Sequence, residues 1–344
     1  MDACIIDTFG QPPRLGTLPD PECPPRGAVV AVHATGVCRS DWHAWQGHDD
    51  SVHLPHVPGH EFAGVVEQVG PEVRRIRVGD RVTAPFILAC GDCEQCRAGA
   101  SQVCPHQQQP GFDLHGSWAQ KLAVVEADHN LVVLPDDLDM TLAAGLGCRV
   151  GTAYHAVKAQ AQVREGEWVA VIGCGGLGLA CVMVAQAAGA QVIAVDVAQS
   201  SLEAAAALGA RALPAGPDVA ERIREVTGGG AHVTLDALGS AATARTGIDS
   251  LRPRGRHVQV GLLLGADSDP SLPMGRVIAQ ELQILGSHGL AAHEYAALLE
   301  DVAGGHLDLT RTVGRVIGFE DLPSALVAMG SPPTHPGMKV ARLR

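Results

Sequence analysis

The second half of the chain alternates between two hydrophobic patterns. Short apolar runs of strand length are followed by segments in which apolar residues recur at three- and four-residue spacing. This alternation predicts strands at 168–173, 191–196, 232–237, 257–260 and 282–285, and helices at 176–188, 200–208, 218–226 and 241–251. Repeated strand–helix–strand units form a parallel sheet covered by helices on both faces. The pattern therefore predicts an α/β fold with a doubly wound parallel sheet.

The first third of the chain has a different pattern. Apolar, β-rich runs at 29–34, 61–69 and 80–88 are separated by Gly, Pro and Asp, which predicts a mostly β, barrel-like domain. Residues 141–160 then have the apolar spacing of a helix. After the last predicted strand come two helices and a short basic end, at 292–302, 320–329 and 339–344. A length of 344 residues is also typical of about two domains.

Composition and charge narrow the class of protein. The chain is 46% hydrophobic, and its 25 Lys and Arg against 37 Asp and Glu give a net charge of −12. An acidic surface disfavours nucleic acid and anionic membranes as main partners, because both attract Lys and Arg. Residues 168–190 carry no charge, but their clustered glycines predict a strand–turn–helix and not a membrane span. The N-terminus shows no signal-peptide pattern, so we expect a cytoplasmic protein.

A glycine-rich turn follows the apolar strand at 169–172. The sequence from Gly173 through Gly175, Gly176 and Leu177 to Gly178 fits G-x-G-x-x-G. Such glycines permit a tight turn, a close approach of the backbone to a pyrophosphate, and close packing of helix on strand. The helix that follows presents free N–H groups to the phosphates. The flanking strand and helix make this a predicted dinucleotide site.

Asp196 ends the next predicted strand, 18 residues after Gly178. A carboxylate at this place accepts hydrogen bonds from the adenosine ribose hydroxyls and repels the 2′-phosphate of NADP. Residues 197–200 contain no Arg or Lys that would bind this phosphate. The sequence therefore predicts a preference for NAD(H), although Asp196 can also be read as the start of a turn.

Four cysteines form a tight cluster in the first third of the chain. Cys90, Cys93, Cys96 and Cys104 lie within fifteen residues, among Gly, Asp, Glu and Gln. In a chain without a secretion signal, such spacing favours metal binding over disulfides. Four thiolates in one exposed loop suit a closed tetrahedral zinc site, which predicts a structural zinc ion.

A second set of metal-ligand types is dispersed along the chain. Cys38 ends a predicted strand, His60 stands in a Gly-His-Glu sequence, and Cys148 precedes an arginine. Two cysteines and one histidine are a mixture found at catalytic zinc sites that keep an open position. Taken singly, each side chain is better explained by burial in a core, Cys148 as a small buried residue and His60 as a hydrogen-bonded core histidine, and the spacing alone does not unite the three.

The motifs and their order resemble those of the zinc-dependent medium-chain alcohol dehydrogenases, within the medium-chain dehydrogenase/reductases. The similarity extends over essentially the whole chain, and it is carried by the sequences at 38–43, 59–64 and 79–82, the four-cysteine loop, the turn at 173–178, and Asp196. It implies a GroES-like catalytic domain at 1–149, to which 287–344 return, and a Rossmann NAD-binding domain at 150–286.

The resemblance also implies roles for single residues. It makes Cys38, His60 and Cys148 the catalytic zinc ligands, with Glu61 beside the metal and able to exchange into its coordination sphere. Asp41 is expected to orient His60. Ser40 and His43 are expected to carry the alcohol proton to solvent. Arg39 and Arg342 match cations that hold the coenzyme pyrophosphate, and 286–289 falls where backbone groups meet the nicotinamide.

The expected protein is thus an oxidoreductase that transfers a hydride between an alcohol, or its aldehyde or ketone, and NAD(H). It would use two zinc ions per chain, and a zinc ion supplies Lewis acidity that favours loss of the alcohol proton. Aromatic side chains are candidates for lining an apolar substrate pocket or for plain core, namely Trp42, Trp45, Phe86 and Phe112. The family similarity suggests a homotetramer, or else a dimer.

Other classes of protein remain as alternatives. A metal-free quinone or enoyl reductase of the same fold would lack the zinc ligands that this chain retains. A polyol dehydrogenase would tend to have a carboxylate in place of Cys148 and often no cysteine loop. A zinc-loop adaptor that binds nucleic acid is disfavoured by the negative net charge.

Overall fold

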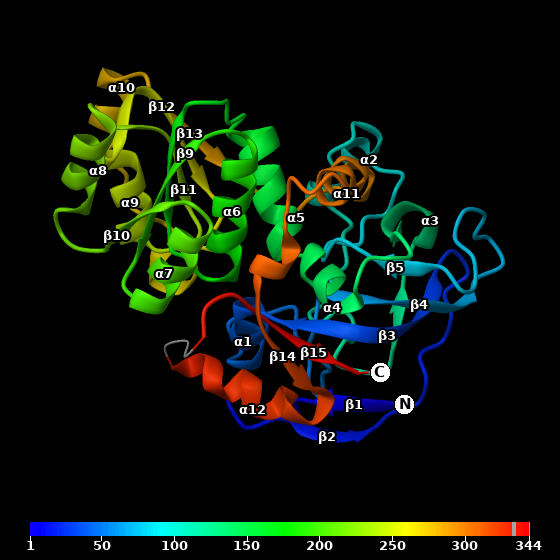
Figure 1. Ribbon diagram of the computed structural model, residues 1–344. Helices are drawn as coiled ribbons and strands as arrows, with labels where there is room; N and C mark the ends of the chain where they lie inside the picture. Colours follow the sequence, from blue (N-terminus) through cyan, green and yellow to red (C-terminus); the bar gives the residue numbers. More distant parts are fainter. Residues whose placement is uncertain (332–334, 344) are drawn as a thin grey trace.

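Two separate β-sheets organise the protein. The computed structural model describes residues 1–331 and 335–343. Figure 1 shows one unit that holds the middle of the chain, in green and yellow, and a second unit in which blue N-terminal and red C-terminal segments lie together. The chain therefore leaves the second unit, builds the first, and returns.

The middle of the chain forms a six-stranded sheet in which all strands are parallel. Its order is β10-β9-β8-β11-β12-β13. The strands are β8 (Trp168–Ile172), β9 (Gln191–Asp196), β10 (Arg211–Pro214), β11 (Ala231–Asp236), β12 (Leu251–Gln259) and β13 (Gln283–Gly286). The strand order reverses between β8 and β11, and such switch points place a ligand crevice at the carboxyl ends of the strands.

Helices connect these strands, and four of them lie where the hydrophobic pattern predicts: α6 (Gly176–Ala187), α7 (Gln199–Ala207), α8 (Val219–Thr227) and α9 (Ala241–Asp249). A fifth, α10 (Met274–Ala279), was not predicted. The doubly wound parallel sheet is therefore confirmed. One strand was not predicted: β10 begins with an arginine and ends with a proline, a composition tolerated because it lies at the edge of the sheet.

The second unit contains a seven-stranded sheet made from both ends of the chain. Its order is β14-β15-β3-β4-β5-β7, and β6 also pairs with β3. The strands are β3 (Ala28–Val37), β4 (Phe62–Val69), β5 (Arg81–Thr83), β6 (Lys121–Val124), β7 (Val132–Val133), β14 (Val313–Gly318) and β15 (Met338–Arg342). A hairpin of β1 (Asp2–Ile5) and β2 (Arg14–Thr17) lies beside this sheet (Figure 1).

Short helices lie in the second unit and between the two units. They are α1 (Arg39–Trp45), α2 (Glu94–Arg97), α3 (Ala127–Asn130), α4 (Met140–Ala143), α5 (Arg149–Tyr154), α11 (Tyr295–Ala303) and α12 (Leu322–Val327). The helix expected at 141–160 is interrupted, because Cys148 adopts φ −121° and ψ −74°, outside the helical region. After α5 the chain continues as a π-helical turn, His155–Gln160. The interruption places Cys148 between the two units.

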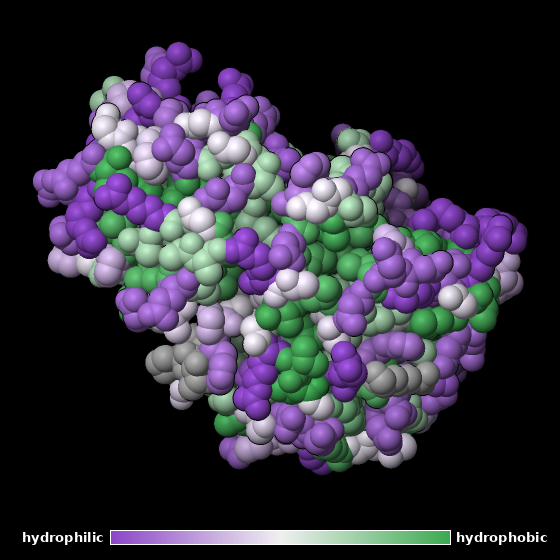
Figure 2. All heavy atoms as spheres, in the orientation of Figure 1, coloured by the Kyte–Doolittle hydropathy of each residue, from purple (hydrophilic) through white to green (hydrophobic). Residues whose placement is uncertain are grey.

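One hydrophobic core joins the two sheets. It includes Ala34 and Ala63 from β3 and β4, Val150 from α5, and Val171 and Val258 from the parallel sheet, all fully buried. Figure 2 shows polar side chains over most of one face of the molecule, with apolar ones gathered mainly along its middle. Within 1–331 and 335–343, no helix combines the length and apolarity needed to cross a membrane.

Candidate metal and coenzyme site

The glycine-rich turn lies at the carboxyl end of β8 and leads into α6. Gly173 has φ +87°, a left-handed conformation that favours glycine. A Cβ at Gly178 would collide with the carbonyl oxygen of Gly173, so helix and turn require this close approach. A Cβ at Gly175 would meet no atom within 4 Å, and this residue caps α6 without a side-chain hydrogen bond. The first N–H groups of α6 are thus left for an anion, which fits a pyrophosphate.

Asp196 stands beside this turn at the end of β9. Its Oδ2 accepts a hydrogen bond from the backbone N–H of Cys174 at 2.7 Å, and its Oδ1 accepts one from Ala198 at 2.8 Å. The side chain is half-buried. A negative charge is therefore fixed next to the glycine turn, where a second phosphate on the ribose would be repelled.

The structure does not bring Arg342 to the glycine turn. On β15 it is Met338 that lies close to the turn, since a Cβ at Gly176 would come within 3.0 Å of its side chain. Arg342 is four residues further along, about 13 Å at the rise of a strand, and lines a hollow with Asp136–Asp139. Lys339, half-buried and paired with Val37 in the register, is the cation of this strand nearer to the metal-site residues.

Three dispersed side chains meet in the junction between the units. Cys38 follows β3, His60 precedes β4, and Cys148 precedes α5. One ligand atom of each lies within 4.8 Å of the others. The Nε2 atom of His60 is buried and has no hydrogen-bond partner among the residues that the structure describes. Two thiols and an orphaned imidazole nitrogen are a donor set that fits a zinc ion with an open fourth position.

Asp41 holds two of these ligands in place. The carboxylate is fully buried, and its Oδ1 accepts a hydrogen bond from Nδ1 of His60 at 2.9 Å. Its Oδ2 accepts a hydrogen bond from the backbone N–H of Cys38 at 2.8 Å. This arrangement fixes the tautomer of His60 and leaves Nε2 directed to the metal position, which is the part expected of Asp41.

Glu61 is held by Arg149. Oε1 of Glu61 accepts hydrogen bonds from Nε of Arg149 at 3.0 Å and from its backbone N–H at 3.1 Å, and Oε2 contacts Nη2. Burial raises the pKa of Glu61, an effect that Arg149 opposes. A hydrogen bond from the Cys148 thiol lowers the pKa of Cys38, and the nearby His60 imidazole lowers it as well. A lower pKa favours the thiolate form, which binds metal.

The residues expected to move the proton lie on α1. Oγ of Ser40 is 3.9 Å from Sγ of Cys38, so the hydroxyl adjoins the metal position. His43 is nearly one turn further along the helix and is half-buried. Arg39 is exposed, donates a hydrogen bond to the carbonyl of Met329 at 2.6 Å, and stacks over the ring of Trp42 at 5.1 Å.

Two of the four candidate aromatic residues approach the metal position. The rings of Phe112 and Phe86 lie 5.5 and 6.2 Å from that of His60. Trp45 is 5% exposed and donates its indole N–H to the carbonyl of Gln11, so it belongs to the core. Trp42 packs against the same core and against Arg39.

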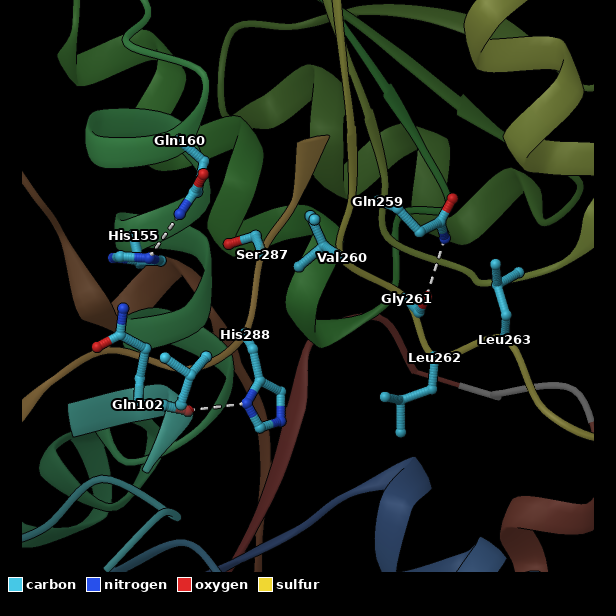
Figure 3. A pocket seen from close by; sticks show the side chains of 12 residues that line it. Gln102, His155, Gln160, Gln259, Val260, Gly261, Leu262, Leu263, Ser287 and His288 are labelled. Atoms are coloured by element: carbon cyan, nitrogen blue, oxygen red, sulfur yellow. Dashed lines mark hydrogen bonds between the residues drawn. The ribbon is translucent and has the colours of Figure 1, made fainter. Parts of the chain in front are cut away.

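Of the segment at 286–289, Gly286, Ser287 and His288 line a pocket at the carboxyl ends of β12 and β13. Figure 3 shows Ser287, Val260 and His288 around this pocket, with His155 and Gln160 on one side and Leu262 and Leu263 on the other. Nδ1 of His288 lies 3.1 Å from the carbonyl oxygen of Gln102, and its ring meets Phe86 edge-on at 5.3 Å. Through Phe86, the pocket adjoins the metal position. The segment expected to meet the nicotinamide therefore lies next to the three metal-site residues.

The four cysteines of the loop also converge. Sγ of Cys104 lies 3.5 Å from Cys90 and 3.8 Å from Cys93, and Sγ of Cys93 lies 3.4 Å from Cys96. Zn–S bonds of about 2.3 Å in tetrahedral geometry separate sulfur atoms by about 3.8 Å. The loop therefore fits a closed zinc site. Asn130 supports it, since its side chain bonds both the N–H and the carbonyl of Ala89.

Comparisons with known proteins agree with this geometry. Residues 24–136 match the alcohol dehydrogenase GroES-like domain, and residues 176–304 match the zinc-binding dehydrogenase family. An alcohol dehydrogenase of Geobacillus stearothermophilus is 36% identical over 292 residues, which are 83% of this chain and 84% of the relative. The chain belongs to the zinc-binding alcohol dehydrogenase family.

Further relatives of this family differ in the substrates that their names give. A probable D-xylulose reductase A of Aspergillus terreus is 34% identical over 315 residues, 88% of this chain and 87% of the relative. The structure of an alcohol dehydrogenase from Thermus sp. ATN1 matches over the whole of both chains, with 31% identity and a TM-score of 0.91. The resemblance inferred from the motifs, and the GroES-like and Rossmann fold that it implies, are confirmed.

Some residues that shape this dehydrogenase site were not found from the sequence. Arg149 and Lys339 are examples, and Tyr295 is a third, because its buried hydroxyl donates to the carbonyl of Leu146 at 3.0 Å and so braces the segment before Cys148. Arg149 could have been found from the sequence, because it directly follows the predicted ligand Cys148. The contact of Tyr295 joins positions far apart in the chain and has no local signature.

Proposed function

We propose that this protein is a zinc-dependent alcohol dehydrogenase that transfers a hydride between an alcohol, or its aldehyde or ketone, and NAD(H). The observation that carries the proposal is the meeting of Cys38, His60 and Cys148 beside the coenzyme crevice, with Nε2 of His60 buried and unpartnered among the described residues. A buried polar atom without a partner is costly, so it marks a position built for a ligand.

Each residue of the site has a distinct task in this proposal. Cys38, His60 and Cys148 would hold the zinc ion, which when bound supplies Lewis acidity that favours loss of the alcohol proton. The hydroxyl of Ser40 accepts that proton at the metal position, and His43 receives it on the way to solvent. Glu61 stays paired with Arg149 and is available beside the metal.

The coenzyme is expected to lie along the crevice of the parallel sheet. Its pyrophosphate would meet the uncapped N-terminus of α6 after Gly175, with Arg39 as a cation on α1. Its adenosine ribose would face Asp196, which supports NAD(H) over NADP(H). Its nicotinamide would enter the pocket at Gly286–His288, next to Phe86.

The division of the chain follows from the same proposal. Residues 1–149 and 287–344 would form the catalytic domain, and 150–286 the coenzyme domain. Two zinc ions per chain are expected, one at the three dispersed ligands and one in the loop of Cys90, Cys93, Cys96 and Cys104. We further propose a homo-oligomer, a tetramer or a dimer, in the cytoplasm. The strand β13 lies at the edge of its sheet, where it can pair with a strand of another copy of the chain.

The test is a panel of alcohols and carbonyl compounds assayed with NAD(H) and followed by nicotinamide absorbance. The apolar rings of Phe86 and Phe112 at the metal position favour hydrophobic alcohols or ketones, and sugar polyols form a second arm because a relative is named D-xylulose reductase. Turnover of any alcohol, lost on removal of zinc and restored by adding it, supports the proposal. Zinc-independent reduction of quinones or enoyl compounds would instead favour the metal-free reductases.

A further inference from the structure

A second histidine contacts His43 on the side away from the metal position. Nδ1 of His43 lies 3.0 Å from Nδ1 of His48, and the ring centroids are 5.4 Å apart. This is the length of an N–H···N hydrogen bond, so one imidazole donates and the other accepts. His43 is half-buried, whereas His48 is exposed to solvent. The pair therefore spans from the interior to the surface.

The backbone fixes the two rings in this arrangement. The N–H of His48 donates to the carbonyl of His43 at 3.0 Å, directly after α1 ends. Gly47, between the helix and His48, has φ +75°, the left-handed conformation that turns the chain back after a helix. The indole of Trp42 packs edge-on against both imidazoles, at 5.1 and 5.9 Å. The contact is thus held from three directions.

No carboxylate competes for these imidazoles within the part of the chain that the structure describes. The charged groups that act on His43 are His48, Arg39 and Cys38. Asp49, next to His48, accepts hydrogen bonds from the backbone N–H and the hydroxyl of Ser51 instead. Desolvation, together with the nearby His48 and Arg39, lowers the pKa of His43, so it gives up a proton readily.

We propose that His48 is the exit of the proton path, taking the proton that His43 receives and releasing it to water. The inference rests on the proposed function, because it extends the path from Ser40 to His43 by one further group. His48 touches neither substrate nor coenzyme in this account. It acts through His43 and is a positioning and proton-accepting residue.

The hand-off conserves protons and creates no buried charge. His43 begins as the tautomer that carries its proton on Nδ1 and donates it to Nδ1 of His48. When Nε2 of His43 takes up a proton from the substrate side, the Nδ1 proton moves to His48, and His43 is neutral again. His48, exposed to solvent, then loses the proton of its Nε2 to water. Proton exchange with water, a loss at Nε2 of His43 and Nδ1 of His48 balanced by a gain at the other nitrogen of each ring, restores the starting tautomers. Carbonyl reduction runs the same steps in reverse.

The experiment compares His48→Gln with His43→Gln and with His53→Gln, an exposed histidine of the same loop that serves as the control. Single-turnover hydride transfer in the zinc-loaded enzyme is followed by nicotinamide absorbance at low and high concentrations of imidazole buffer. For His48→Gln we expect a fall of about three- to tenfold at low buffer, a fraction of the 10²–10⁴ that general acid–base groups contribute. Added imidazole should restore the rate, while His53→Gln stays at the wild-type rate.

A second readout does not depend on activity. In ¹⁵N NMR spectra of the wild-type protein, His43 should show its proton on Nδ1, and His48→Gln should raise the pKa of His43 because it removes one of the groups that lower this pKa. A His48→Gln enzyme with the wild-type rate at every buffer concentration would overturn the inference while leaving the function intact. A His43→Gln enzyme with the wild-type rate would overturn the proton path itself, and the hand-off with it.

Discussion

Glu61 and Arg149 form a buried ion pair that joins two distant segments of the chain. Glu61 directly follows His60, and Arg149 directly follows Cys148. The guanidinium bonds both carboxylate oxygens, and the side chains are 0% and 8% exposed. Because each member is the neighbour of a metal-site residue, the pair sets the distance between two of the three ligands.

Replacing Arg149 by Met should therefore damage both stability and metal binding. The change leaves Glu61 buried without a counter-charge, which costs about 3–5 kcal/mol. We expect the midpoint of urea unfolding to fall and the zinc content to drop by one ion per chain, as measured by elemental analysis. Arg254→Met, at a residue whose side chain is 83% exposed, is the matched control and should change neither quantity. Wild-type zinc content in Arg149→Met would show that the pair does not position the ligands.

Asp41 provides a more selective test of the metal site. Asp41→Asn removes the negative charge and turns one of the two accepting oxygens into an NH2 group. The side chain can then no longer accept both from the N–H of Cys38, which bonds Oδ2, and from the N–H of Gly59 and Nδ1–H of His60, which bond Oδ1. We expect a loss of about 10–100-fold in zinc affinity, the usual effect of removing such a partner. Competition with a chromophoric chelator measures it. Asp50→Asn in the adjoining exposed loop is the control, and equal affinities of the two variants would contradict the role of Asp41.

The cysteine loop should lose its order when one thiol is removed. Cys96→Ser takes away one of four converging sulfur atoms, and we expect one zinc ion per chain to be lost while the dispersed site keeps its own. Arg97 is the only basic residue between Cys90 and Cys104, so limited trypsin digestion should cut after it in this variant. Cys23→Ser, outside both clusters, should remain uncut there. Resistance of Cys96→Ser to trypsin would mean that the loop is ordered without metal.

The choice of coenzyme should depend on the charge of Asp196. With Asp196→Asn the repulsion of a 2′-phosphate is removed, so the preference for NAD(H) over NADP(H) should narrow by about tenfold, equivalent to about 1.4 kcal/mol. Values of kcat/KM with both coenzymes measure this. Asp218→Asn, at an exposed position after β10, should leave the ratio unchanged. A wild type that prefers NADP(H) would refute the assignment.

The sequence predicts best what is encoded locally. The turn at 173–178 and the loop of four cysteines are short, their residues act at fixed spacing, and the structure shows both as expected. Cys38, His60 and Cys148 are different, since only pairing of β3 with β4 and the interruption of the helix at Cys148 bring them together. The apolar spacing predicted a continuous helix over 141–160, because one residue with non-helical backbone angles does not change the spacing of the apolar residues around it.

Positions near the C-terminus were the hardest to predict. Residues 339–344 look like a basic end, yet Val340 and Ala341 are fully buried where β15 adds to β3. The same register explains the error for Arg342. Met338 at the start of the strand lies close to Gly176, whereas Arg342 is four residues, about 13 Å, further along the strand and so lies away from the turn. A pairing between residues about 300 apart leaves no local pattern from which register can be read.

His56 gives the protein a dependence of stability on acid. It is 3% exposed, its Nε2 has no partner among the described residues, and burial lowers its pKa from 6.5 to about 4. Between these values the unfolded chain binds a proton that the folded chain does not, so stability falls as pH drops from 6.5 to 4, by about 3 kcal/mol. His56→Gln should remove this part of the acid loss, seen in urea midpoints at pH 7 and pH 4.5. His53→Gln, at an exposed histidine, leaves the zinc ligands unchanged, serves as the control and should follow the wild type. An equal fall in the urea midpoint from pH 7 to pH 4.5 in all three proteins would show that His56 is protonated in the folded state.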